Sequence, residues 1–131
     1  MTGTPIDRRT VLLGSAVVGA GAVLTACAGA RAPAVAAGPV GPAADVPVGG
    51  GVIYARQRVV VTQPTDSVFK AFSAVCPHAG CLVAEVKPAG IACRCHGSLF
   101  SIKDGSVLVG PADAGLDART VTVSAGVLTV S

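Results

Sequence analysis

The chain has 131 residues and a formal net charge of +3, from ten Lys and Arg residues against seven Asp and Glu. Its basic residues stand singly apart from Arg8-Arg9, so we expect no nucleic-acid partner. Aromatic residues make up only 3% of the chain and Trp is absent, which argues against a large hydrophobic core. We therefore expect at most one small domain, of a size that commonly depends on a metal or a disulfide for its stability.

Residues 1–27 have the pattern of an export signal. Arg8-Arg9 precedes residues 11–26, an apolar run of 16 residues without a charge, which is short for a membrane span. The arginine pair resembles a twin-arginine signal, and Leu24-Thr25-Ala26-Cys27 resembles the lipobox at which bacterial lipoproteins are cleaved. We expect export to the outer face of the cytoplasmic membrane, with a lipid anchor on Cys27. An ordinary secretion signal or an uncleaved anchor would share the charged pair and the apolar run.

Residues 28–51 consist almost entirely of Ala, Gly, Pro and Val, and their four spaced prolines after Arg31 disfavour a regular helix. This composition predicts a semi-flexible linker with a typical reach of roughly 25 Å. Such a linker would let a folded domain move above a membrane while it stays attached. A passive spacer would have the same composition.

Residues 52–131 alternate short β-branched or aromatic runs with turn residues, and no stretch has a convincing helical period. The pattern predicts an all-β fold of antiparallel pairs. The expected strands are 52–54, 58–62, 68–75, 82–86, 91–93, 99–102, 107–109, 120–123 and 127–130.

Six of the seven Cys and His residues lie in two short runs, Cys76-Pro77-His78-Ala79-Gly80-Cys81 and Cys93-Arg94-Cys95-His96-Gly97-Ser98. Each run follows an expected strand, so two neighbouring loops would present their side chains to one point. A Cys-x-His run followed by a Cys-x-x-His run is the ligand pattern of a [2Fe–2S] centre in which thiolates hold one iron and imidazoles the other. The predicted ligands are Cys76, His78, Cys93 and His96. The remaining cysteines, Cys81 and Cys95, occupy matching places and could bridge the two loops.

Two other uses of these residues are open from the sequence. A structural zinc ion accepts Cys and His ligands, but the Cys-x-His spacing suits it poorly and leaves the other residues of both runs unexplained. Two disulfides among the four cysteines would fit an exported protein, but they would leave both histidines without a role.

Residues 68–116 resemble the cluster-binding part of Rieske iron–sulfur proteins, in particular the disulfide-containing form of cytochrome bc complexes. The two motifs of that form, Cys-x-His-x-Gly-Cys and Cys-x-Cys-His-Gly-Ser, are both complete here. The resemblance implies a small antiparallel β sandwich in residues 52–131, with a cluster-binding subdomain of two loops at about residues 74–100. It also implies a Cys81–Cys95 disulfide.

The resemblance further assigns roles around the cluster to Gly80, Gly97, Ser98 and Pro111. Ser98 would donate a hydrogen bond to a bridging sulfide, which favours the reduced state. Pro111 would belong to a loop that covers the cluster from a third side.

Two positions depart from the family pattern. The usual tyrosine two residues after the serine is Phe100 here, and a phenyl ring cannot donate a hydrogen bond to a cysteine sulfur. We therefore expect a reduction potential below that of the quinol-oxidising members. Ala79 replaces a bulkier residue between His and Gly of the first motif, which should leave the cluster loop less shielded.

The implied function is one-electron transfer, with no catalytic activity of the chain's own. We favour a membrane-tethered extracytoplasmic carrier, or a small subunit of a redox complex, with redox proteins as partners. The alternative is the electron-transfer subunit of an oxidoreductase such as quinol–cytochrome c reductase, with quinol or a cytochrome as partner. An alternative of another class is a binding or structural domain in which the metal only stabilises the fold.

Overall fold

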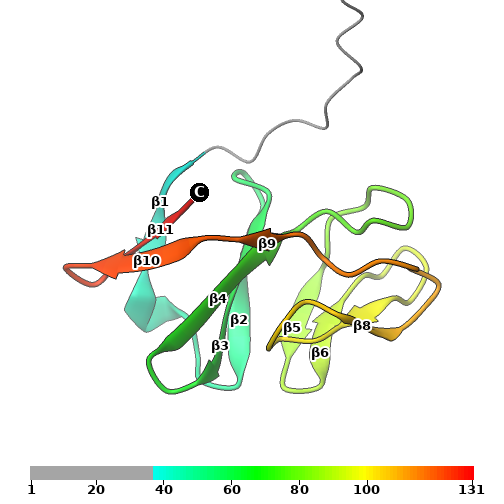
Figure 1. The fold of residues 1–131 in the computed structure, drawn as a ribbon, viewed down its shortest axis with the longest axis horizontal. Helices are drawn as coiled ribbons and strands as arrows, with labels where there is room; N and C mark the ends of the chain where they lie inside the picture. The colour runs from blue at the N-terminus through cyan, green and yellow to red at the C-terminus, as the bar shows by residue number, and fades with distance from the viewer. Residues whose placement is uncertain (1–36) are drawn as a thin grey trace, which may run out of the picture. The chain divides into compact units, whose positions relative to one another are not determined.

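The computed structural model of the protein describes residues 37–131. In that part, eleven strands and one short 3₁₀ helix form the regular structure, so the all-β prediction is confirmed (Figure 1). The strands make three sheets in which every pairing between strands is antiparallel. No helix within residues 37–131 is long and apolar enough to cross a membrane.

The first sheet joins the two ends of the described chain. Its strands, in spatial order, are β1 (Gly38–Pro42), β11 (Val127–Val130) and β10 (Val121–Ser124). β10 and β11 form the hairpin expected at the end of the sequence, with Ala125 and Gly126 both at positive φ in its turn. The fully buried Leu128 and Val130 of β11 contribute to one of the two cores.

The second sheet lies between the other two, and its inner strand β3 (Val59–Thr65) supplies side chains to both cores. Its strands, in order, are β2 (Gly50–Tyr54), β3, β4 (Val68–Ser73) and β9 (Ala118–Arg119). Val59, Val60 and Val61 of β3 are all completely buried, and successive side chains point to opposite faces of a strand. Val59 and Val61 pack into the core beside β11, while Val60 packs into the core beneath the two cysteine loops.

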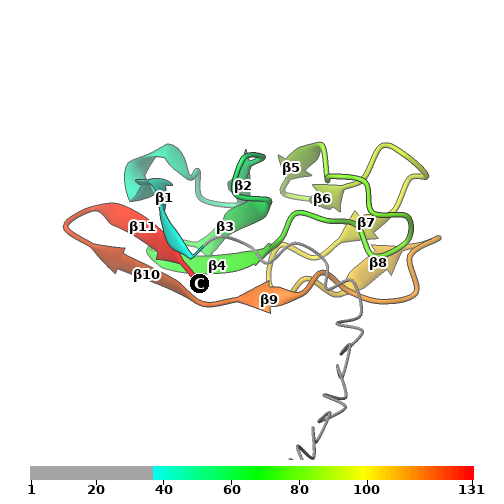
Figure 2. The ribbon, with the colours of Figure 1, turned by 90° about the horizontal axis from the view of Figure 1, so that it is seen from above.

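The third sheet carries the cysteine loops. Its strands, in order, are β5 (Glu85–Lys87), β6 (Gly90–Ala92), β7 (Leu99–Phe100) and β8 (Val107–Val109). Seen from above, this sheet lies at one end of the domain, and β1, β10 and β11 lie at the other (Figure 2). The buried Thr62 hydroxyl of β3 donates to the carbonyl of Ile102 at 2.7 Å, which connects the second sheet to the chain after β7.

The predicted linker is wrong from Gly38 onward. Residues 38–51 form β1, the 3₁₀ helix η1 (Ala43–Asp45) and the start of β2, and Val46 is only 2% exposed in the core beside β11. β1 pairs with β11 alone and is an edge strand, where a proline removes no hydrogen bond that a second neighbour needs. Its sequence Gly-Pro-Val-Gly-Pro therefore forms a strand without the residues that usually indicate one. Residues 28–36 lie outside the described part of the chain.

The other expected strands are present; β8 and β11 have the expected bounds, and the rest have shifted ends. The hairpins of β5 with β6 and of β7 with β8 are formed as predicted. β9 was not expected, because it is only two residues long and pairs with β4 at Ala71 and Phe72.

Candidate metal centre

The two cysteine loops have the same backbone design. The loop of residues 76–81 follows β4, and the loop of residues 93–98 joins β6 to β7. In each loop the first N–H donates to the last carbonyl, and the glycine N–H donates back to the first carbonyl, at 2.7 to 3.0 Å. The glycines, Gly80 at φ 78° and Gly97 at φ 84°, adopt a conformation that L side chains rarely take. The motif glycines therefore close the loops, which is the role that the structure gives to both.

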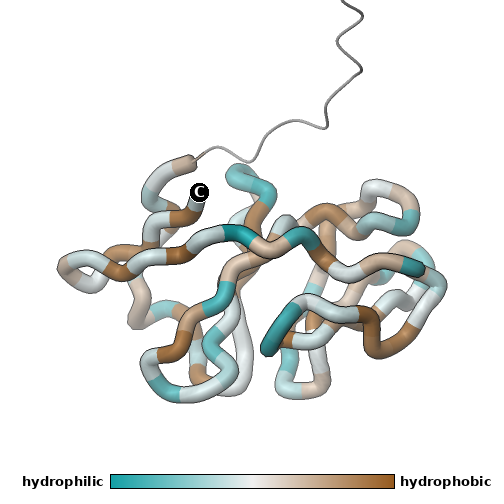
Figure 3. The backbone as a smooth tube through the Cα atoms, in the orientation of Figure 1, coloured by the Kyte–Doolittle hydropathy of each residue, from teal (hydrophilic) through white to brown (hydrophobic). Residues whose placement is uncertain are grey.

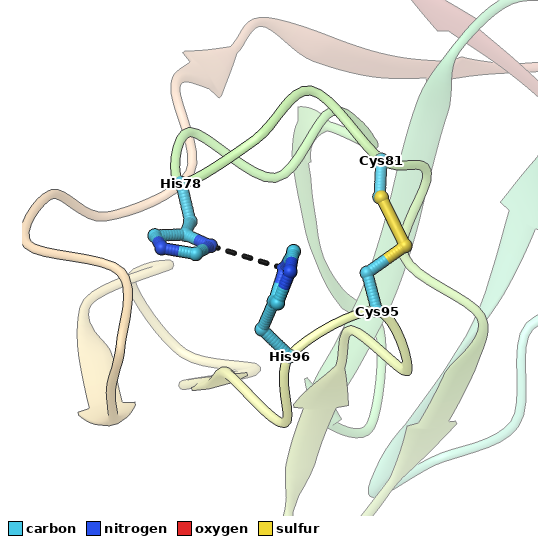
Figure 4. Close-up of a disulfide and its surroundings, with 4 residues drawn as sticks. All are labelled: His78, Cys81, Cys95 and His96. Atoms are coloured by element: carbon cyan, nitrogen blue, oxygen red, sulfur yellow. Dashed lines mark hydrogen bonds between the residues drawn. A yellow bond between two sulfur atoms is a disulfide. The ribbon is translucent and has the colours of Figure 1, made fainter.

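A disulfide joins the loops, as the resemblance implied. The Cys81 and Cys95 sulfurs are bonded, and their Cα atoms lie 6.6 Å apart across a sequence separation of 14. Figure 4 shows this bridge on one side of the space between the loops, with His78 and His96 on the other side. The two loops are thus covalently held beside each other, and any pair of ligands drawn from both is held with them.

The two histidines turn toward each other. The Nδ1 atoms of His78 and His96 lie 3.2 Å apart, and the ring planes are nearly perpendicular, at 78° (Figure 4). Both residues are exposed. Two inward Nδ1 atoms from separate loops, with the rings at the surface, could hold one metal ion and keep the Nε2 edges accessible.

Cys76 and Cys93 are the free cysteines of the described chain, and both are buried at 2% exposure. Burial raises the pKa of the Cys93 thiol, and the neighbouring Cys76 thiol adds to the rise. Interaction with the backbone amides of Cys95 and His96 acts in the opposite direction and favours the thiolate. Two adjacent buried thiols that are not bonded to each other lack a counter-charge for their thiolate forms. A metal cation supplies that charge, and binding releases the thiol protons.

The four candidate ligands therefore come as two pairs. Within residues 37–131, no three Cys, His, Asp or Glu side chains are grouped around one position as the ligands of a single ion. A buried sulfur pair and an exposed nitrogen pair, each drawn from both loops, match the mixed ligand set of a two-iron centre. These residues fit a [2Fe–2S] cluster, with Cys76 and Cys93 able to hold one iron and His78 and His96 the other.

A third segment contacts the loops through Ser98. The Ser98 side chain is 1% exposed, and its Oγ accepts a hydrogen bond from the Ala112 N–H at 3.0 Å. Because this bond uses a lone pair of Oγ, the hydroxyl hydrogen remains free to donate. Pro111 is exposed beside Ala112, whereas Leu116 is buried in the core beneath the loops. The structure thus joins residues 110–116 to the second loop, while donation from Ser98 to a sulfide stays a prediction.

Both departures from the family pattern lie next to the candidate site. The Phe100 ring is completely buried in the same core as Cys76 and Cys93. Ala79 is exposed in the first loop, next to His78. The lower potential predicted from Phe100 remains to be measured.

Sequence reasoning missed an ionic cluster at the second loop. Glu85 of β5 contacts Lys87 at 2.8 Å and Arg94 at 3.5 Å. The pKa of Glu85 is lowered, chiefly by the hydrogen bond from Lys87 and also by the charge of Arg94. Only the strand register could have revealed this cluster, because Glu85 pairs with Ala92 across β5 and β6. The predicted signal residues Arg8, Arg9 and Cys27 lie outside the described residues.

The chain is similar to known proteins that contain a Rieske [2Fe-2S] domain. The family model of the Rieske [2Fe-2S] domain matches residues 37–122. The cytochrome b6-f complex iron-sulfur subunit of Chlorobaculum tepidum is 41% identical over 95 residues, which cover 70% of this chain and 51% of that protein. The putative respiratory nitrate reductase subunit Rieske of Haloferax mediterranei is 38% identical over 71 residues, covering 53% of this chain and 32% of that protein. The chain thus spans about half of one curated relative and about a third of the other.

Solved structures have the same architecture. The cyanobacterial plasma membrane Rieske protein PetC3 from Synechocystis PCC 6803 aligns with a TM-score of 0.59 and 30% identity, over 71% of this chain and 97% of that one. The ferredoxin of carbazole 1,9a-dioxygenase from Nocardioides aromaticivorans IC177 is similar in fold, with a TM-score of 0.54 and 20% identity over 71% of this chain and 96% of that one. With the family model covering residues 37–122, the chain belongs to the Rieske [2Fe-2S] domain family.

Proposed function

We propose that this protein is an exported, membrane-anchored electron carrier, or a small subunit of a redox complex, that transfers one electron at a time. Membership of the Rieske family gives the cofactor, one [2Fe–2S] cluster, and electron transfer through it. The observation that carries the proposal is the pairing of two buried free thiols with two facing imidazoles on loops joined by a disulfide.

The residues of the two loops have separate tasks in this proposal. When bound, the cluster supplies one-electron redox chemistry without an open position for a substrate. Cys76 and Cys93 would hold one iron, and their burial in the core would exclude water from it. His78 and His96 would hold the other iron, and a partner could approach their exposed rings. The disulfide keeps the loops at a fixed separation, so that the four ligands need little rearrangement when the oxidation state changes.

The location is proposed from the first 27 residues. A twin-arginine signal exports proteins that are already folded, which suits a domain whose cluster is inserted before export. Lipid on Cys27 would then keep the domain at the outer face of the cytoplasmic membrane. The signal and the cluster motif are independent features of the sequence, and both favour the same order of events.

Quinol oxidation in a cytochrome bc type complex is the second candidate. The observation that favours it is the 41% identity to a cytochrome b6-f complex iron-sulfur subunit. Phe100 and Ala79 favour the carrier instead. Compared with the family pattern, Phe100 lacks the hydroxyl donor of a tyrosine, and Ala79 shields the cluster loop less than a bulkier side chain would. The measured potential and the proteins that co-purify from membranes would separate these two candidates.

The central test is purification of the full chain under anaerobic conditions from cells supplied with iron. We expect a coloured protein with two iron and two sulfide ions per chain as a [2Fe–2S] cluster requires, bleached on reduction, with a paramagnetic resonance signal in the reduced state. The Cys93→Ser variant should lose colour and iron, because it replaces a predicted ligand. Cys27→Ser makes the same chemical change outside the loops and should keep both. A folded unmodified protein without iron would contradict the proposal, and bound zinc would favour the structural alternative.

A further inference from the structure

We infer that Arg94, held by Glu85, is a positioning residue that places a positive charge beside the sulfur-ligated side of the centre and favours its reduced state. The inference rests on the proposed function, because it concerns the same cluster. Arg94 lies between Cys93, a predicted ligand, and Cys95, which forms the disulfide. The backbone on both sides of Arg94 is therefore fixed, and the charge cannot move far from the loop.

The strand register determines which acidic side chain meets this charge. Glu85 pairs directly with Ala92 across β5 and β6, and Arg94 follows two residues after Ala92. β6 ends at Ala92, so Arg94 lies at the start of the second loop, close to the strand end that faces Glu85. The Arg94 Nη2 atom is 3.5 Å from the Glu85 Oε2 atom. The carboxylate thereby contacts the guanidinium on the β5 side, while most of the Arg94 side chain stays in solvent.

Lys87 changes the charge balance of this cluster. Its Nζ atom is 2.8 Å from the Glu85 Oε1 atom, the carboxylate oxygen that Arg94 does not contact. Two cations, Lys87 and Arg94, therefore share the Glu85 carboxylate, and the three side chains together have a formal charge of +1. The side chains of Arg94 and Lys87 are 73% and 63% exposed. The ion pairs themselves add little stability at such exposure, so their effect is expected on the charge of the site and not on folding.

A positive charge near a redox centre stabilises the form with one more electron. For charges on the order of 10 Å apart and an effective dielectric constant of about 40 to 80, the equilibrium constant of reduction changes by about two- to fourfold. Removing Arg94 should lower this constant, and removing Glu85 should raise it. Both effects should diminish at high ionic strength, because salt screens exposed charges.

The test is redox titration of the cluster-loaded full chain at low and high salt. Arg94→Gln should lower the equilibrium constant of reduction by about two- to fourfold. Arg94→Lys should restore most of it, and Glu85→Gln should raise it. Lys70→Gln is the matched control: it removes an exposed positive charge from β4, in the second sheet, and should leave the constant unchanged. Visible and paramagnetic resonance spectra should be the same in all variants, showing that the ligands are intact.

The outcomes separate this inference from the proposed function. An unmodified chain that contains no cluster would overturn the proposed function, and the inference with it. A cluster-loaded chain in which Arg94→Gln behaves like Lys70→Gln would overturn the inference alone. Should Arg94→Gln fail to load a cluster, two other variants still test the inference. An equilibrium constant of reduction that is unchanged in Glu85→Gln would contradict it. A constant that falls in Arg94→Lys by the two- to fourfold expected of Arg94→Gln would contradict it too.

Discussion

Phe100 differs by one oxygen atom, the phenol hydroxyl, from the tyrosine that the family pattern has at this position. Its ring is completely buried in the core that also contains Cys76 and Cys93, so a hydroxyl added there must find a partner within that core. In Phe100→Tyr, donation to a cysteine sulfur would raise the equilibrium constant of reduction by roughly ten- to a hundredfold, since hydrogen bonds to charged groups contribute about 1.5–3 kcal/mol. Redox titration would measure the change.

The matched control is Phe69→Tyr, which makes the same change at a half-buried ring in the core beside β11. It should leave the potential unchanged. If the Phe100→Tyr potential equals that of the unmodified protein and unfolding becomes easier, the new hydroxyl has no sulfur partner. The prediction that Phe100 lowers the reduction potential would then be wrong.

The residues of the two motifs could be identified from sequence because their roles are local. Gly80 and Gly97 close their own loops, and Cys81 and Cys95 take equivalent places in them. The contact between Glu85 and Arg94 could not be identified in this way, since it depends on a strand register that spacing alone does not fix. The same holds for the Ala112 N–H that donates to Ser98, fourteen residues away.

Residues 38–51 show that amino-acid composition alone does not predict whether a segment is a strand or a linker. Prolines and glycines favour a linker, yet β1 forms because β11 pairs with both of its ends, on either side of an irregularity between Pro39 and Gly41. Val46 is then buried by residues that come more than ten positions later, including β3 and β11. Propensity describes a segment alone, whereas an edge strand is stabilised by its neighbour.

This correction predicts a difference between two valines that are two residues apart. Val46 is 2% exposed and Val48 is 59% exposed, although both lie in the segment expected to be a linker. Val46→Ala should lower the free energy of unfolding by roughly 2 kcal/mol, because it leaves a cavity in the core. Val48→Ala should change it by less than about 0.5 kcal/mol. Denaturant unfolding of the cluster-loaded protein would test both, and equal effects would contradict the burial of Val46.

At the scale of the whole molecule, the first 27 residues predict where the domain works. Replacing Arg8 and Arg9 together by Lys should leave the protein in the cytoplasm, because twin-arginine export depends on that pair. Cys27→Ser should allow export but release the protein from the membrane, because the serine hydroxyl is not lipidated as the thiol would be. Cell fractionation with a blot for the protein would measure both.

Two results would contradict this location. Membrane attachment of Cys27→Ser would show that the apolar run remains as an anchor. Normal export of the double lysine variant would show that the signal is of the ordinary secretory kind. Neither result would bear on the cluster, whose predicted ligands all lie beyond residue 75.

β3 contributes alternate side chains to the hydrophobic interior on both of its faces, Val60 toward the cysteine loops and Val59 and Val61 toward β11. We expect the two halves of the domain to unfold together, because both depend on this shared strand. Loss of iron during heating should therefore coincide with collapse of the sheet that contains both ends of the folded chain. The end that contains the cysteine loops should thus have the same unfolding temperature as the rest of the domain, which unfolds as one cooperative unit.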